Sequence, residues 1–302
     1  MKIQRATFMG VSGVPDLSVD LTEATTGAPR SLVVVSGPGA SGKTRMIEAL
    51  MAAKEAIRAY GPMTPGAPWI RSGGAAKIRI AFHIGEEERA FAGTDARTLE
   101  AEVVFRPDRT HAEADDGLRA VLGRYSHNGA HGKLDYVPAE RRIPTFPPFA
   151  GLGTGEQRIV RLAKDPRKYG FVLPFLRSLD HDAPRRERFA QSLAALSPTC
   201  RYEPDPTGDA MVRCFQSRGG SAVTAAQLSH AEADAVLLAA TAALVGLDHS
   251  IVFIDRPDLH VEALEPLLLG LEALGEDNQL WLTGGARLSA AARRAHHVSL
   301  DG

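Results

Sequence analysis

The 302-residue chain contains few cysteines, few aromatic residues and almost no net charge. Its two cysteines, Cys200 and Cys214, are too few for a disulfide framework or a four-thiolate zinc site, and they suit a reducing compartment. The 35 lysines and arginines nearly balance the 36 acidic residues, for a net charge of -1. This balance excludes a strongly basic nucleic-acid coat and an acidic tail. The balance is compatible with a local basic patch that binds nucleic acid, but it does not indicate one.

Long apolar runs are also missing. No run approaches the roughly 18 residues that a membrane helix needs, and the opening MKIQRATFMG does not resemble a signal peptide. We therefore expect a cytoplasmic protein without membrane contact. The length fits one large domain, or one core that carries a sizeable insertion.

Strand and helix patterns alternate along the chain. Ser31–Ser36 is a continuous β-branched run, typical of a strand buried on both faces, and helical spacing of apolar residues begins at Lys43. The pattern predicts an α/β fold with a central, mainly parallel sheet and N-terminal antiparallel strands. The other predicted strands are Lys2–Phe8, Leu17–Leu21, Lys77–Ile84, Leu99–Arg106, Met211–Gln216, Ile251–Asp255, Gln279–Thr283 and His297–Leu300. The other predicted helices are Pro184–Leu196, His230–Leu247 and Leu259–Leu274.

A glycine-rich segment follows the first buried strand and matches G-x-x-x-x-G-K-[ST], the Walker A pattern, in full. Glycines let the backbone N–H groups approach phosphate oxygens, and the helix that follows adds the positive end of its dipole. The lysine is expected to reach the β- and γ-phosphates of a nucleoside triphosphate, and the threonine to offer its hydroxyl to Mg²⁺. The predicted nucleotide-binding residues here are Gly37, Pro38, Gly39, Ala40, Ser41, Gly42, Lys43 and Thr44.

A second motif completes this site. Ile251–Asp255 is an apolar strand that ends in a carboxylate, the arrangement that holds Mg²⁺ in P-loop enzymes, so Thr44 and Asp255 are the predicted metal ligands. Lys43 and Asp255 are 212 residues apart, which is too far for a compact small-molecule kinase or a small GTPase. Only a class that inserts a whole lobe between the two motifs fits this spacing.

Several segments together resemble a known family. Tyr136–Arg141 (YVPAER), Gln227–Glu232 (QLSHAE), Ile251–His260 (IVFIDRPDLH) and Leu280–Gly284 (LWLTG) follow the phosphate loop in order. They are similar to the motifs of the AAA/ABC-type P-loop ATPases, in the soluble branch with the RecF, SMC and OLD-like proteins. The resemblance is good over residues 1–60 and 205–302 and rests in the middle on YVPAER alone.

The resemblance implies a single ATPase head over residues 1–302, with its core in 1–60 and 205–302 and an inserted lobe at about 61–204. It also implies a head-to-tail dimer that encloses two ATP molecules, each with Mg²⁺. Each γ-phosphate would contact Lys43 of one subunit and Ser229 of the other. Because we expect no effector domain after Gly302, an effector would be a separate protein, and the chain could act in a DNA-processing or defence complex.

Three positions depart from the family pattern. Arg256 replaces the glutamate that polarises the attacking water, and a guanidinium cannot accept a proton at neutral pH. Gly284 replaces the switch histidine, and Ala231 replaces the glycine of the signature. The catalytic residue is therefore unknown. Asp258, Glu232 and Glu140 are the candidates to take the place of the glutamate.

Two hypotheses follow from these departures. In the first, the chain is an ATPase head with weak hydrolysis that acts as a nucleotide switch for an effector or DNA. In the second, it is a non-hydrolysing ATP-binding module that serves as a structural or sensor subunit.

Overall fold

The computed structural model describes residues 1–61, 67–71, 74–144, 151–203, 215–216 and 219–300. Its strands are β1 Lys2–Met9, β2 Leu17–Asp20, β3 Leu32–Ser36, β4 Ala76–His83, β5 Thr98–Phe105, β6 Thr110–Ala114, β7 Leu134–Val137, β8 Arg201–Tyr202, β9 Phe215–Gln216, β10 Ala222–Val223, β11 Ile251–Asp255, β12 Gln279–Thr283 and β13 His296–Ser299. Its α-helices are α1 Lys43–Ile57, α2 Glu86–Ala92, α3 Asp116–Gly123, α4 Thr154–Val160, α5 Val172–Ser178, α6 Ala183–Leu196, α7 His230–Val245, α8 Leu264–Glu272 and α9 Ala286–Ala291. Short 3₁₀ turns are η1 Ala67–Trp69, η2 Pro166–Phe171, η3 Leu179–His181 and η4 Ala225–Gln227.

A five-stranded parallel sheet of order β13-β3-β12-β11-β7 forms the centre of the molecule. Alternate residues of β3 face opposite sides: Val33 and Val35 join one hydrophobic core, and Leu32 and Val34 join another. This is the two-residue period of a strand, and both sides of the sheet are covered. The continuous apolar runs of the sequence exist because every position of these strands meets a core.

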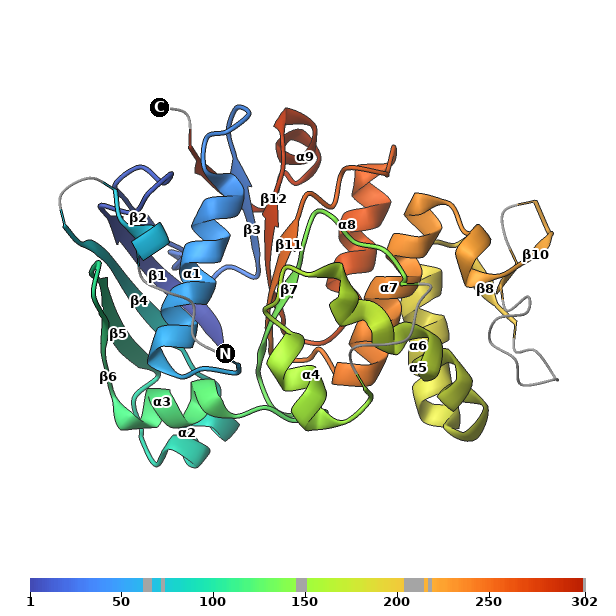
Figure 1. The fold of residues 1–302 in the computed structure, drawn as a ribbon, viewed down its shortest axis with the longest axis horizontal. Coiled ribbons are helices and arrows are strands. Elements are labelled where there is room, and N and C mark those ends of the chain that lie inside the picture. The colour runs from blue at the N-terminus through green and yellow to red at the C-terminus, as the bar shows by residue number, and fades with distance from the viewer. Residues whose placement is uncertain (62–66, 72–73, 145–150, 204–214, 217–218, 301–302) are drawn as a thin grey trace.

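The second sheet is antiparallel, with the order β2-β1-β4-β5-β6. Helix α1 lies between it and the parallel sheet, as Figure 1 shows. Met46, Ile47 and Leu50 of α1 belong to the same core as Phe8 of β1 and Trp281 of β12. The predicted antiparallel strands near the N-terminus are confirmed, and so is the α/β class.

Helices cover the other face of the parallel sheet, where α7, α8 and α9 pack on β11 and β12. Helices α5, α6 and α7 enclose a third core together with the small sheet β10-β9-β8. Edge-to-face ring contacts run through this core, from Phe175 to Phe189 at 5.7 Å and from Phe189 to Tyr202 at 5.4 Å. Among the described residues, none of the helices is long and apolar enough to cross a membrane.

One predicted boundary was wrong. The helix expected from residue 259 begins at Leu264. A start at residue 259 would place Pro266 in the helix interior, where proline removes a hydrogen bond and clashes with the preceding turn. Beginning at Leu264 puts this proline in the first turn, where it is tolerated.

Two other expectations were only partly testable. Of the strand predicted at Met211–Gln216, residues 211–214 lie outside the described residues and the remainder is β9. The segment 61–204 supplies β4–β6 to the antiparallel sheet and β7 to the edge of the parallel sheet. The division into a core and an inserted lobe stays a prediction.

Candidate nucleotide-binding site

The glycine-rich loop connects the end of β3 to the start of α1, and its backbone depends on glycine. Gly37 and Gly42 have φ angles of 148° and 97°, and Ala40 also has a positive φ of 62°. A Cβ on Gly42 would lie 1.8 Å from the carbonyl oxygen of Gly13. Only glycine therefore fits at this turn, and the tight loop leads directly into the first turn of α1.

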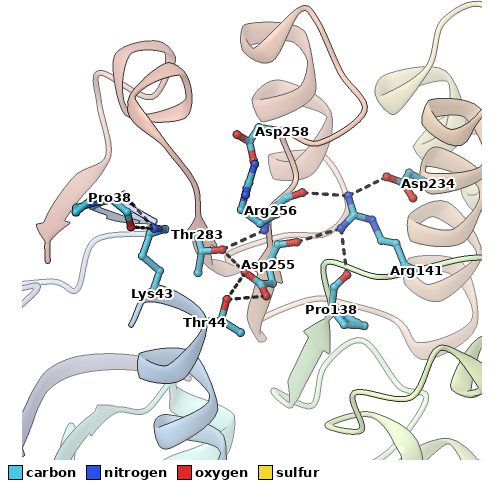
Figure 2. A network of polar contacts seen from close by, with 11 residues as sticks. Pro38, Lys43, Thr44, Pro138, Arg141, Asp234, Asp255, Arg256, Asp258 and Thr283 are labelled. Atoms are coloured by element: carbon cyan, nitrogen blue, oxygen red, sulfur yellow. Dashed lines mark hydrogen bonds and ion pairs between the residues drawn. The ribbon is translucent and has the colours of Figure 1, made fainter. Parts of the chain in front are cut away.

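Polar groups of the loop are available to a ligand. The N-cap of α1 is Gly42, so no side chain caps the first N–H groups of the helix. The Oγ of Ser41 is buried and has no hydrogen-bond partner in the part of the chain that is described. Lys43 folds over the loop, and its Nζ donates to the carbonyl oxygens of Gly37 at 2.9 Å and Pro38 at 2.6 Å (Figure 2).

Asp255, at the end of β11, joins the two halves of the site. Thr44 donates its Oγ1 hydrogen bond toward both carboxylate oxygens, at 3.0 Å from Oδ1 and 2.9 Å from Oδ2. Thr283 ends the neighbouring strand β12 in register with Asp255, and its hydroxyl also donates to this carboxylate. Asp255 is 4% exposed, so a buried carboxylate faces the start of α1. Thr44 and Asp255, the two predicted metal ligands, therefore lie together although they are 211 positions apart in the sequence.

Comparison with solved structures finds the same arrangement of elements along almost the whole chain. The SMC head bound to the C-terminal winged-helix domain of ScpA superposes with a TM-score of 0.62 at 14% identity, covering 99% of this chain and 94% of that one. The fold is that of an SMC head domain. The Pyrococcus furiosus SMC head follows at 0.59 and 13% identity, covering 96% and 91%, and the Thermotoga maritima head at 0.51 and 13%, covering 97% and 92%.

SMC heads are ABC-ATPase-type P-loop NTPases, so the resemblance noted in the motifs agrees with the fold. No protein-family model and no curated protein matches the sequence. At 13–14% identity these matches establish the fold alone. They assign no role to any residue of the site.

Arg256, the residue after Asp255, has an unusual backbone conformation. Arg256 has a φ of 51°, and its backbone N–H donates to the Thr283 hydroxyl at 3.0 Å. Its Nε donates to Oδ1 of Asp258 at 3.0 Å, in an ion pair whose carboxylate is only 9% exposed. Asp258, one of the carboxylates predicted as a candidate base, is thus already paired with a guanidinium (Figure 2).

Gly284 has no room for a larger side chain. A Cβ at this position would lie 2.5 Å from Cδ2 and 2.8 Å from Cβ of Leu288. Leu288 is a fully buried residue of α9, so it cannot swing into solvent. The close packing of Leu288 therefore excludes a side chain as large as histidine at this position in the turn between β12 and α9.

The remaining predicted residues lie at the start of α7 and after β7. Ser229 is the exposed N-cap of α7, and its N–H and Oγ both donate to Oε2 of Glu232, at 3.0 and 2.8 Å. The Glu232 carboxylate thus completes a capping box. Glu140 is exposed in the turn that follows β7. Whether any of these residues contacts a nucleotide or a water stays a prediction.

Sequence reasoning missed the connections of Arg141. This guanidinium is almost completely buried, and its Nη1 donates to the carbonyl oxygens of Pro138 and Asp255, both at 3.1 Å. Its Nη2 lies 3.4 Å from the carbonyl oxygen of Arg256 and 2.8 Å from Oδ2 of Asp234 in α7. The segment YVPAER carried the signal, but Asp234 is distant in sequence and nothing there indicated it as the partner.

Further buried charged residues lie in β7 and in the segments that pack against it. Asp135 pairs with Arg161 at 3.3 Å, and both side chains are inaccessible. The Nζ of Lys168 donates to the carbonyl oxygens of Tyr136 and Arg161. Burial lowers the pKa of Lys168 to about 7, although the Asp135 carboxylate acts in the opposite direction. Burial also raises the pKa of Tyr136, so its phenol stays neutral beside Asp255.

Proposed function

We propose that this head binds ATP with Mg²⁺ on the loop Gly37–Thr44 and acts as a nucleotide-dependent switch. The observation that carries the proposal is the Thr44–Asp255 contact: a hydroxyl at the start of α1 and a buried carboxylate at the end of β11 meet at 3.0 Å or less. These hard oxygen donors are the ligands that Mg²⁺ prefers beside phosphate oxygens and water.

The residues of the loop fit a triphosphate. The uncapped N–H groups of α1, the Ser41 hydroxyl, which has no partner among the described residues, and the Lys43 ammonium are all donors that can bind phosphate oxygens. Lys43 would exchange the carbonyl oxygens of Gly37 and Pro38 for phosphate oxygens, because a charged acceptor binds an ammonium more strongly than a neutral one. Thr44 and Asp255 would hold Mg²⁺, which would neutralise phosphate charge.

Slow hydrolysis is the expected behaviour of this site. The position of the usual glutamate holds Arg256, Asp258 is paired with that guanidinium, and Glu232 caps α7. The absence of a positioned base costs about two to four orders of magnitude in rate. The same observations support the second candidate, an ATP-binding module that does not hydrolyse its nucleotide at all.

Dimerisation belongs to the same proposal. Ser229 is exposed at the start of α7, where it can face another molecule, and the proposed contact is with the nucleotide on Lys43 of a second copy. A separate partner protein is also proposed. The SMC head of similar fold is described as bound to the C-terminal winged-helix domain of ScpA, which supports a protein partner for this head as well.

The test combines binding and turnover. A fluorescent ATP analogue is titrated with Mg²⁺ into the wild type, Lys43→Ala and Arg109→Ala, a control at an exposed arginine between β5 and β6. We expect binding in the wild type and the control and at least tenfold weaker binding in Lys43→Ala, because one charge-assisted contact is lost.

Phosphate release is then measured at saturating Mg-ATP for the same three proteins. Release above the Lys43→Ala blank means a weak ATPase, and release equal to the blank with intact binding means a non-hydrolysing switch. Absence of binding in the folded wild type would overturn the proposal.

A further inference from the structure

Arg141 connects the turn after β7 with the end of β11, the residue that follows it, and helix α7. Figure 2 shows its guanidinium between the backbone of Asp255 and Arg256 on one side and the Asp234 carboxylate of α7 on the other. The Asp255 carbonyl that it holds belongs to the residue whose carboxylate accepts from Thr44. Arg141 therefore connects the end of β11, where Mg²⁺ is proposed to bind, with helix α7, whose N-cap is Ser229.

The second partner of Asp234 strengthens this connection. His260 Nδ1 lies 3.2 Å from Asp234 Oδ2, and His260 follows β11 in the same turn as Arg256. The segment after β11 is thus connected to Asp234 of α7 in two ways: directly by His260, and through Arg141, which contacts the carbonyl oxygen of Arg256. Asp234 is five residues after Ser229, about 7.5 Å along the helix axis, so its position determines where the helix start lies.

Helix α7 can transmit a displacement as a rigid body. From Asp234 to Val245 all its residues are buried, in contact with both the parallel sheet and the helical core. An apolar side chain in place of a buried ion pair often gives equal or greater stability, so stability alone gives little reason for a buried guanidinium here. What the fork-shaped group offers is a fixed geometry between one carboxylate and backbone carbonyls.

We propose that Arg141 is a positioning residue that couples the occupancy of the Asp255 site to the orientation of α7, and through it to Ser229. This inference rests on the proposed function, because it needs a nucleotide on the loop. Arg141 touches no nucleotide in this scheme and acts through the Asp255 carbonyl and the Asp234 carboxylate.

The test is hydrogen exchange of the first turn of α7, residues 229–235, with and without Mg-ATP. In the wild type we expect Mg-ATP to slow exchange there about tenfold, the size of one charge-assisted hydrogen bond. Arg141→Gln and Asp234→Asn should reduce this effect below about twofold while ATP still binds. Arg141→Lys, which retains the charge without the fork, should restore part of it.

The matched control is Arg161→Gln, which breaks a buried arginine–carboxylate pair against Asp135 in β7. If that variant does not fold, Arg188→Gln serves, since Arg188 pairs with Asp248 at 2.7 Å. A purely structural role of Arg141 would lower the unfolding temperature of Arg141→Gln and leave the ATP-dependent change in exchange intact.

The outcomes separate the two proposals. If the analogue titration shows no binding in the wild type, the proposed function fails by itself. If ATP binds but α7 is unaffected in the wild type, or is affected equally in Arg141→Gln, the coupling is overturned and the nucleotide site stands. If only the Arg141 and Asp234 variants lose the effect, the coupling is supported.

Discussion

Two glycines of the same loop, Gly39 and Gly42, place different demands on their positions. The φ of Gly42 is 97°, and its Cα faces the Gly13 carbonyl oxygen at a distance that leaves no room for a Cβ. A Cβ on Gly39 would have no heavy atom within 4 Å. The Walker A pattern requires glycine at position 42 but not at position 39, in agreement with the backbone conformation and the free space at each position.

We expect Gly42→Ala to lower the free energy of unfolding by about 2–5 kcal/mol, because it combines a left-handed backbone with a steric overlap. Gly39→Ala should stay within about 0.5 kcal/mol of the wild type, as substitutions that meet no neighbour do. Urea unfolding of both variants checks this. Equal losses would show that the loop has a different conformation in solution.

At the scale of single residues, local pattern and tertiary contact contributed differently to the site. Lys43, Thr44 and Asp255 could be predicted because each has a fixed place after a strand or at the start of a helix. The Arg141–Asp234 pair could not, because no periodic pattern connects a turn after β7 with the inside of α7. The roles predicted for these residues toward ATP and Mg²⁺ stay predictions.

Among the elements, the continuous apolar segments were the predictable ones. Strands β3 and β11 are short apolar runs bounded by turn residues and α7 is a longer one, because hydrophobic cores cover both faces of these strands and enclose α7 from Asp234 onward. Helices α2 and α3 and strand β7 were not predicted, because each carries charged residues among only a few apolar ones. Their secondary structure depends on tertiary packing, which a local sequence pattern does not reveal.

The capping box of α7 separates a structural from a catalytic role for Glu232. We expect Glu232→Gln to cost at most about 1 kcal/mol of stability, because the amide oxygen can still accept from Ser229. Phosphate release should change less than twofold, whereas loss of a general base would cost at least about a hundredfold. Glu265→Gln, in the exposed first turn of α8, is the control. A hundredfold loss confined to Glu232→Gln would make this residue the base.

Lys168 gives the contact between η2 and β7 a pH dependence. Its folded pKa of about 7 lies below the unfolded value, so the unfolded chain binds more protons as pH falls from about 10 to 7. Stability should therefore increase with pH in this window, with about 1.4 kcal/mol per pH unit from this group. Lys168→Met should flatten the slope of unfolding free energy between about pH 7.5 and 9.5. The exposed Lys164→Met should keep it, and an unchanged slope in Lys168→Met would contradict the prediction.

At the scale of the whole molecule, the two groups proposed to meet one nucleotide begin helices on opposite faces of the parallel sheet. Helix α1 packs between the sheets, and α7 packs on the far face (Figure 1). This placement fits the proposed dimer, in which one nucleotide contacts Lys43 of one copy and Ser229 of another. Mass action then makes association depend on the nucleotide.

Mixing two defective chains tests this arrangement directly. Lys43→Ala and Ser229→Ala should each fail to associate with Mg-ATP, because every site in either homodimer lacks one group. In a mixture, the Lys43 of one chain and the Ser229 of the other complete one of the two sites, so part of the wild-type association should return. Sedimentation velocity with Mg-ATP, and with Mg-ADP as the control, measures it. Association of either single variant at wild-type level would mean that this residue is not part of a shared site, and a mixture no better than its components would exclude the head-to-tail dimer.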